Sequence, residues 1–126
     1  MITDIEDFQD KQETDVLFDC EYTSVDAVIN QITVFTGVKD NVQTDNGLRT
    51  LIAYGEGNNR SAFFTDSKRL KEVVLNPLQR FPFRAIIKVV RFGMMYGFRF
   101  TSPSCEITQD DVENFEHYKR TKFRKR

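Results

Sequence analysis

Positive and aromatic side chains alternate along residues 83–100, FRAIIKVVRFGMMYGFRF, on either side of a break at Gly93. Lys and Arg neutralise the phosphates of a nucleic acid strand, and an aromatic ring offers a face on which any base stacks for about 1–3 kcal/mol. The same mixture also keeps an apolar pair of strands soluble. The run therefore indicates either a surface for phosphates and flat bases or an ordinary solvated hairpin.

Residue types that carry out catalysis are sparse. His117 is the single histidine, and Cys20 and Cys105 form no CxxC or Cys/His pattern. No Ser/His/Asp or Cys/His set and no metal-binding spacing is present. The GEGNN segment lacks the Lys-Ser/Thr of a phosphate-binding loop. We therefore expect a protein that is not an enzyme, with two inert thiols and no metal, cofactor or small-molecule substrate.

Charge is distributed unevenly along the chain, although the net charge is only −1. Residues 1–26 hold nine acidic residues against Lys11, whereas residues 27–103 hold eleven basic residues against five acidic ones. Residues 104–126 are nearly balanced and end in the basic sequence KFRKR. A basic middle segment predicts an anionic partner, although a solvated surface explains many such charge runs.

Length and composition predict one compact domain. The chain has 126 residues, of which 40% are hydrophobic and 13% aromatic, which is enough for a single core. No run of about 18 apolar residues and no signal peptide is visible, so we expect a cytoplasmic protein that makes no membrane contact.

The hydrophobic pattern predicts five strands and two helices. Alternation predicts a strand over residues 28–38, and the polar segment KDNVQTDNG that follows predicts a loop. Asp66 or Ser67 can cap a helix that Pro77 ends, and a second helix is expected after Thr108. The remaining expected strands are residues 48–54, 60–65, 83–91 and 95–101.

Five strands with one helix between the third and the fourth is the layout of an OB-fold, a small Greek-key barrel. The predicted fold class is therefore all-β with minor α, a closed five-stranded OB-fold barrel. An acidic N-terminal arm (1–26) would precede the barrel (27–103), and a C-terminal helix with a basic tail (104–126) would follow. A ferredoxin-like or RRM domain needs a helix after the first strand, and an SH3-like barrel does not accommodate the capped helix.

Three stretches, VFTGVKDNVQTDNGLRTLIAY, AFFTDSKRLKEVV and FPFRAIIKVVRFGMMYGFRF, carry a family resemblance. Together they resemble the small single-stranded DNA-binding OB proteins of phages and mobile elements. The resemblance covers about residues 28–103 and implies single-stranded DNA binding with weak sequence preference, in support of replication or recombination. The basic end KFRKR departs from the acidic tail with which many bacterial single-stranded DNA-binding proteins end.

An OB barrel binds single strands across its second and third strands and through the loops of its hairpins. These positions give the candidate nucleic-acid-binding residues, with RNA as the alternative ligand to DNA. Alternation along residues 83–91 also directs Arg84 and Lys88 outward, beside the apolar Ile86 and Val90, and alternation along residues 95–101 does the same for Arg99. Cover for that face would come from the arm, the C-terminal helix or a second subunit, and a homo-oligomer is expected. The candidates are Lys39, Arg49, Arg60, Phe63, Lys88, Arg91, Phe92, Tyr96 and Arg99.

Several aromatic rings have an alternative role in packing. Phe98 and Phe100 are expected in the core, because small barrels fill their interiors with large side chains. Phe63 and Phe64 are adjacent, so one should face inward and the other outward, and Phe35 is either a stacking platform or a packing contact. The alternative function is a protein-interaction or assembly module that uses the same face without nucleic acid.

Overall fold

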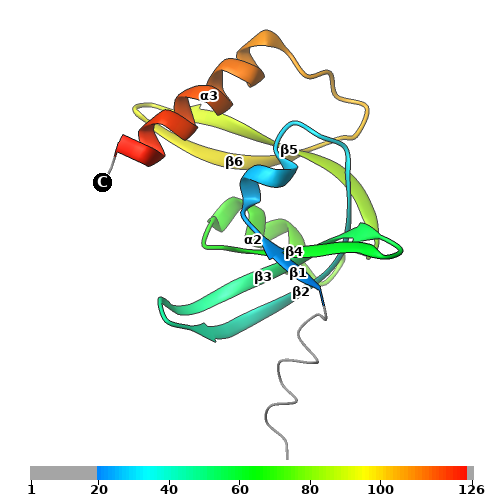
Figure 1. The fold of residues 1–126 in the computed structure, drawn as a ribbon. Coiled ribbons are helices and arrows are strands. Elements are labelled where there is room, and N and C mark those ends of the chain that lie inside the picture. The colour runs from blue at the N-terminus through cyan, green and yellow to red at the C-terminus, as the bar shows by residue number, and fades with distance from the viewer. Residues whose placement is uncertain (1–19, 125–126) are drawn as a thin grey trace, which may run out of the picture.

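A six-stranded mixed sheet forms the body of the protein (Figure 1). The structure is a computed structural model that describes residues 20–124, and the side chains as far as residue 121. The strands lie in the order β1-β4-β3-β2-β5-β6. They are β1 (Glu21–Thr23), β2 (Thr33–Thr44), β3 (Gly47–Glu56), β4 (Asn59–Thr65), β5 (Phe83–Phe92) and β6 (Met95–Thr101).

The sheet curls strongly but remains an open half-barrel. Strands β2 to β6, which correspond to the five expected strands, follow the order β4-β3-β2-β5-β6. Closure would require the two end strands of this order, β4 and β6, to pair, but β4 pairs with β1 instead. The closed five-stranded barrel expected from the sequence is therefore wrong, although the mostly β architecture is confirmed.

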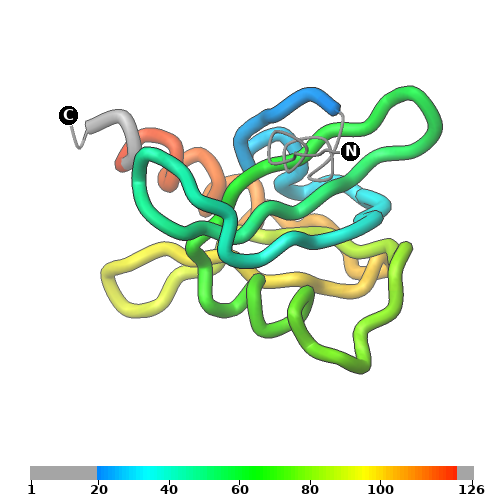
Figure 2. Tube along the Cα trace, turned by 90° about the horizontal axis from the view of Figure 1, so that it is seen from below, coloured from blue at the N-terminus to red at the C-terminus, as the bar shows by residue number. Residues whose placement is uncertain are grey.

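Two antiparallel hairpins define one end of the molecule. The turn between β2 and β3 and the turn between β5 and β6 extend toward the same side, at the left of Figures 1 and 2. The turn between β3 and β4 lies at the opposite side. The helix α2 (Lys68–Val74) lies between the β2–β3 hairpin and the β5–β6 hairpin in the view of Figure 1.

Strand β2 lies later in the chain than the sequence pattern predicted. Residues 28–32 are not a strand, because Val25–Val28 form the 3₁₀ helix η1 and Asn30 has a positive φ of 61° that interrupts extended backbone. The strand then continues through most of the expected polar loop to Thr44. An irregularity in the pairing with β3 accommodates Asn41, whose φ is 56°. Only the turn before Gly47 remains as the predicted loop.

The described sheet begins earlier than the predicted barrel boundary at residue 27. Glu21–Thr23 pair in parallel with Ser61–Phe63 as β1, and Val25 packs against the core. The remainder of the expected acidic arm, residues 1–19, lies outside the described residues. Residues 20–26 are thus part of the folded domain.

Helix α2 begins where its cap predicts. The Ser67 side chain accepts a hydrogen bond from the Leu70 backbone N–H, which satisfies a donor that the first turn leaves without a partner. Leu70 and Val74 are buried on the inward side of the helix. The short helix therefore contributes its inward side to the main core.

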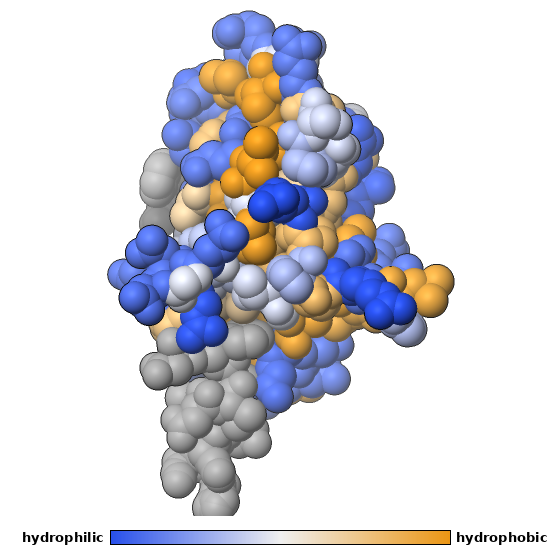
Figure 3. Space-filling model, turned by 90° about the vertical axis from the view of Figure 1, so that its right-hand side faces the viewer, coloured by the Kyte–Doolittle hydropathy of each residue, from blue (hydrophilic) through white to orange (hydrophobic). Residues whose placement is uncertain are grey.

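Strands β2 to β5 contribute most of the core. Phe35 and Phe63 are fully buried within it, and Phe98 and Phe100 pack against it, as predicted for the latter two. Phe35 is thus a packing residue, with its ring centroid 5.1 Å from that of Phe100. Hydrophobic residues also form a broken band on the surface turned away from the two hairpin tips (Figure 3). Exposed apolar area alone therefore does not identify a binding surface.

Helix α3 (Gln109–Arg124) lies across the β5–β6 hairpin (Figure 1). Its first turn has a reciprocal cap, in which the Asp111 N–H donates to Thr108 Oγ1 and the Thr108 N–H donates to Asp111 Oδ2. Phe115 and Tyr118 then pack against the core from the helix. None of the helices in the described part of the chain has the length and apolar composition needed to cross a bilayer.

Candidate nucleic-acid interface

An open cavity occupies the gap between the two free edges of the half-barrel. We call this gap the seam, and the cavity of about 520 Å³ within it the seam cavity. One wall comes from β1, β3, β4 and the start of α2, and the other from β6 and α3. The lining residues are Thr23, Ser24, Val25, Arg49, Phe64, Thr65, Asp66, Ser67, Tyr96, Gly97, Phe98 and Tyr118.

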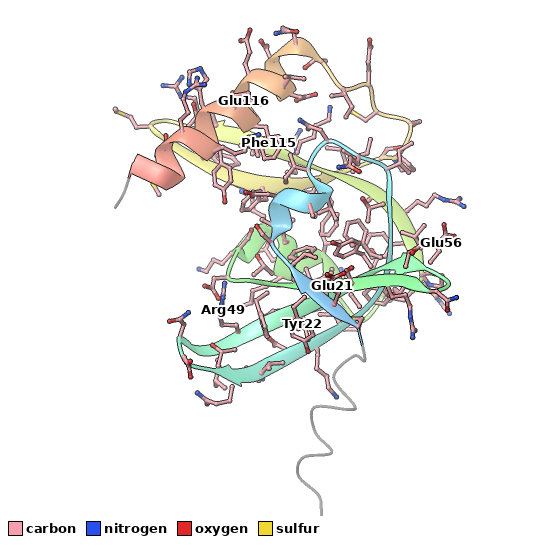
Figure 4. All side chains as sticks on the ribbon, in the orientation of Figure 1. Glu21, Tyr22, Arg49, Glu56, Phe115 and Glu116 are labelled. Carbon is pink, nitrogen blue, oxygen red and sulfur yellow. The ribbon has the colours of Figure 1, made fainter. Side chains whose placement is uncertain are left out.

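Arg49 is the cation at the seam cavity. Its Nε donates to Asp66 Oδ1 at 3.1 Å, and its guanidinium lies 5.6 Å from the centre of the Phe64 ring. The Arg49 side chain is 25% exposed and that of Asp66 is 70% exposed. An ion pair in contact with water typically contributes about 0–1 kcal/mol, so another anion can displace Asp66 at small cost. Figure 4 shows Arg49 at the end of β3 beside the β2–β3 turn.

Aromatic rings form much of both walls of the seam cavity. Phe64 stands on the β4 side and contacts Tyr22, with a distance of 5.7 Å between ring centroids. Tyr96 and Phe98 come from β6, and Tyr118 of α3 meets Phe98 edge-on at 5.3 Å. Rings from elements far apart in the sequence thus converge on one opening.

The β5–β6 hairpin tip adds a second group of cations and rings. Arg91 is exposed opposite Tyr96 in the strand register, and its Nε donates to the Gly93 carbonyl. The guanidinium of Arg69, from α2, lies 4.1 Å from the centre of the Phe92 ring. Three predicted residues, Arg91, Phe92 and Tyr96, are therefore neighbours at this tip. Tyr96 also lines the seam cavity together with Arg49.

Three other predicted cations lie elsewhere. Arg60 is exposed opposite Gly55, next to the β3–β4 turn at the far end of the molecule. Lys39 is half-buried in the middle of β2, opposite Leu51. Arg99 is exposed on β6, but it does not line the seam cavity.

Two predicted site residues are inaccessible in this structure. Phe63 is fully buried in the core, so its ring offers no face to a base. Lys88 is only 7% exposed, because α3 covers the outer side of β5. Its Nζ lies 2.7 Å from Asp111 Oδ2 and also donates to the Glu106 carbonyl and to Cys105 Sγ. The prediction that Lys88 is exposed to solvent is therefore wrong. Of the three covers considered for this face, the C-terminal helix is the one that the structure shows.

The Lys88–Asp111 pair is held in its charged form. The hydrogen bond to Asp111 raises the pKa of Lys88 against the opposing effect of burial. Burial disfavours the Asp111 carboxylate, but hydrogen bonds from Lys88 and Thr108 outweigh it and lower the pKa of Asp111. The pair therefore fastens α3 to β5 and has no role at the seam.

Sequence reasoning missed several residues of the seam cavity. Phe64 belonged to an adjacent pair of rings in which one had to face outward, and burial of Phe63 identifies it. Phe115 follows Asp111 by four residues and Tyr118 follows Phe115 by three, the pattern of one helix face. Nothing in the sequence showed that this face would reach the same opening as Asp66.

The side chains of the described residues form no cluster suited to a metal ion. Within residues 20–121, no group of three or more His, Cys, Asp or Glu side chains could hold a metal ion. The arrangement instead provides one paired cation, several rings and a set of hydroxyl groups, which suits binding of a flat ligand that carries negative charge.

A family model matches residues 19–101, and the chain belongs to that family, which is described as a domain of unknown function, DUF8468. Comparison with curated proteins and with solved structures found no match. The matched range begins just before β1 and ends with β6, so the family's domain comprises the complete sheet without α3.

Proposed function

We propose that the chain is a non-enzymatic protein that binds single-stranded DNA with weak sequence preference. The bound strand would pass between the β2–β3 and β5–β6 hairpin tips and cross the seam. The observation that carries the proposal is the meeting of Arg49 and Tyr96, from separate hairpins, at one open cavity lined with rings. Arg69, Arg91 and Phe92 extend the same combination along the β5–β6 tip.

The order of the strands supports a relationship to OB-fold proteins. With the strand order β4-β3-β2-β5-β6, the turns of the β2–β3 and β5–β6 hairpins lie on one side of the sheet. An OB-fold has its binding loops at the corresponding turns. The resemblance of residues 28–103 to phage and mobile-element proteins suggests a role in replication or recombination in the cytoplasm. A homo-oligomer stays a prediction, since α3 already covers the face of β5 that motivated it.

Fluorescence anisotropy of a labelled oligo-dT provides the test. Phosphate neutralisation on a single strand lowers log K by about 0.7 per contact for each unit of log[salt]. Contacts from Arg49, Arg69 and Arg91 thus predict a slope of about −2 or steeper. A duplex of equal length is the control and should bind more weakly, and an oligo-U of equal length compares RNA with DNA. Absence of binding at low salt would contradict the proposal.

A protein-interaction module is the second candidate function, and exposed apolar residues at the β5–β6 turn favour it. Met94 and Met95 are 89% and 72% exposed. In the described sheet, β6 pairs only with β5, so its other edge presents backbone groups that an added strand could pair with. A failure to bind any single strand at low salt would favour this candidate.

A further inference from the structure

We propose that the seam cavity takes one unpaired base of the bound strand, while Arg49 leaves Asp66 to bind the adjoining phosphate. This inference rests on the proposed function and makes it more specific. It distinguishes one nucleotide position within the seam cavity from the surface of the hairpin tips.

The volume of the seam cavity suits a single small ligand. About 520 Å³ lies within the usual range of small-molecule sites, roughly 300–1,000 Å³. The opening is the gap that β4 and β6 leave by not pairing, so a strand that crosses the seam can insert a base without any change in the sheet.

The walls of the cavity fit an aromatic guest. Phe64 stands on one side and Tyr96 and Tyr118 stand on the other. The edge-on contact with Phe98 supports the Tyr118 ring, and the contact with Tyr22 supports the Phe64 ring. Rings that neighbours already hold in place lose little conformational freedom when a base stacks on them.

Hydroxyl groups give the cavity polar contacts for the edge of a base. Ser24 Oγ accepts from the Asp26 N–H, and Ser67 Oγ accepts from the Leu70 N–H. A hydroxyl that accepts one hydrogen bond still has an O–H to donate. Base edges that present carbonyl or ring-nitrogen acceptors are therefore the chemical class that this wall would bind.

The Arg49–Asp66 pair places a phosphate site at the mouth of the cavity. The guanidinium already stacks over Phe64, so its orientation is partly fixed. A phosphate offers bidentate hydrogen bonds of the kind that Arg prefers. Because Asp66 is 70% exposed, its carboxylate returns to water when the phosphate replaces it.

Photocrosslinking tests this assignment. An oligo-dT that carries one 5-iododeoxyuridine is bound, irradiated and digested, and mass spectrometry identifies the attached residue. We expect crosslinks to Phe64, Tyr96 or Tyr118. Crosslinks confined to Phe92 and the methionines of the tip, with normal affinity, would overturn the cavity assignment and leave the proposed function intact. Absence of oligo-dT binding would overturn both.

Matched ring substitutions supply a second readout. Tyr96→Ala should weaken binding by about 5–150-fold, the equivalent of one lost stacking contact. Tyr96→Phe keeps the ring and should recover most of the affinity that Tyr96→Ala loses, which separates loss of the ring from loss of the hydroxyl group. Phe92→Ala removes a ring outside the cavity and should reduce the affinity less. Equal losses for Tyr96→Ala and Phe92→Ala would contradict a special position at the seam.

Discussion

Lys88 and Arg49 lie in two regions that look alike in sequence but differ in structure. Both are cations on strands, beside apolar and aromatic residues, and both are predicted to contact phosphate. Lys88 is covered by α3 and paired with Asp111, whereas Arg49 stands at the open seam with an exposed partner. The element packed over a cation, more than the strand that carries it, therefore decides whether the cation holds the fold together or can contact a ligand.

The largest expected effect is a loss of stability when the Lys88–Asp111 ion pair is broken. Lys88→Met leaves the Asp111 carboxylate, whose side chain is 13% exposed, without its lysine. Loss of one member of a buried pair typically costs about 3–5 kcal/mol, and we expect the lower end because the Thr108 N–H still bonds the carboxylate. Urea denaturation should show this decrease in the free energy of unfolding. Arg99→Met is the matched control, since Arg99 lies opposite Lys88 but is exposed, and it should change stability by less than about 0.5 kcal/mol.

The pH dependence of stability checks the same pair. The lowered pKa of Asp111 means that its contribution is present above the ordinary carboxyl pKa and is lost as the pH falls through the folded value. The raised pKa of Lys88 means that its contribution is present below the ordinary lysine pKa and is lost as the pH rises through the folded value. The contribution of the pair to stability should therefore stay level from about pH 5 to 10, and Lys88→Met should lose the acidic decrease that the pair causes.

An intermediate effect on oligo-dT affinity is expected for a substitution at the seam, but not for one at the far end of β3. Arg49→Ala should weaken oligo-dT binding by about tenfold, the equivalent of roughly 1.5 kcal/mol, and should reduce the salt slope by about 0.7. Arg60→Ala removes the same charge beside the β3–β4 turn and should leave both quantities unchanged. Equal losses in the two variants would show that net charge, not position, governs binding.

The smallest expected effect is an increase in the affinity for oligo-dT. Asp66→Asn frees Arg49 from its exposed partner, and we expect a roughly 1.5–5-fold increase in affinity, in line with the energy of a surface ion pair. Glu56→Gln removes the same charge at the opposite end of β3 (Figure 4) and serves as the control. Tighter binding in both variants, or in neither, would remove Asp66 from the proposed exchange.

Local signals in the sequence predicted the later part of the fold well. The apolar alternation of 83–91 and 95–101 and the Ser67 cap gave β5, β6 and α2, because neighbouring residues determine these features. The predicted start of β2 was wrong, because Asn30 adopts a positive φ and the apolar alternation carries no sign of it. Strand β1 is only three residues long and exists through its parallel pairing with β4, which no local pattern reveals.

The candidate site was predictable only in its chemistry. Alternating cations and rings predicted a surface for phosphates and bases, which stays a prediction, and Arg49 and Tyr96 do line one cavity. The sequence could not show that α3 removes Lys88 from solvent while it brings Tyr118 to the seam. Both outcomes depend on where one helix docks, which is a matter of tertiary packing.

The reciprocal cap of α3 has a consequence for folding cooperativity. Asp111 completes the first turn of the helix and also bonds to Lys88, so one carboxylate serves both helix initiation and docking. Loss of that carboxylate should therefore loosen the first turn of the helix and its contact with β5 together, in place of two separate local openings.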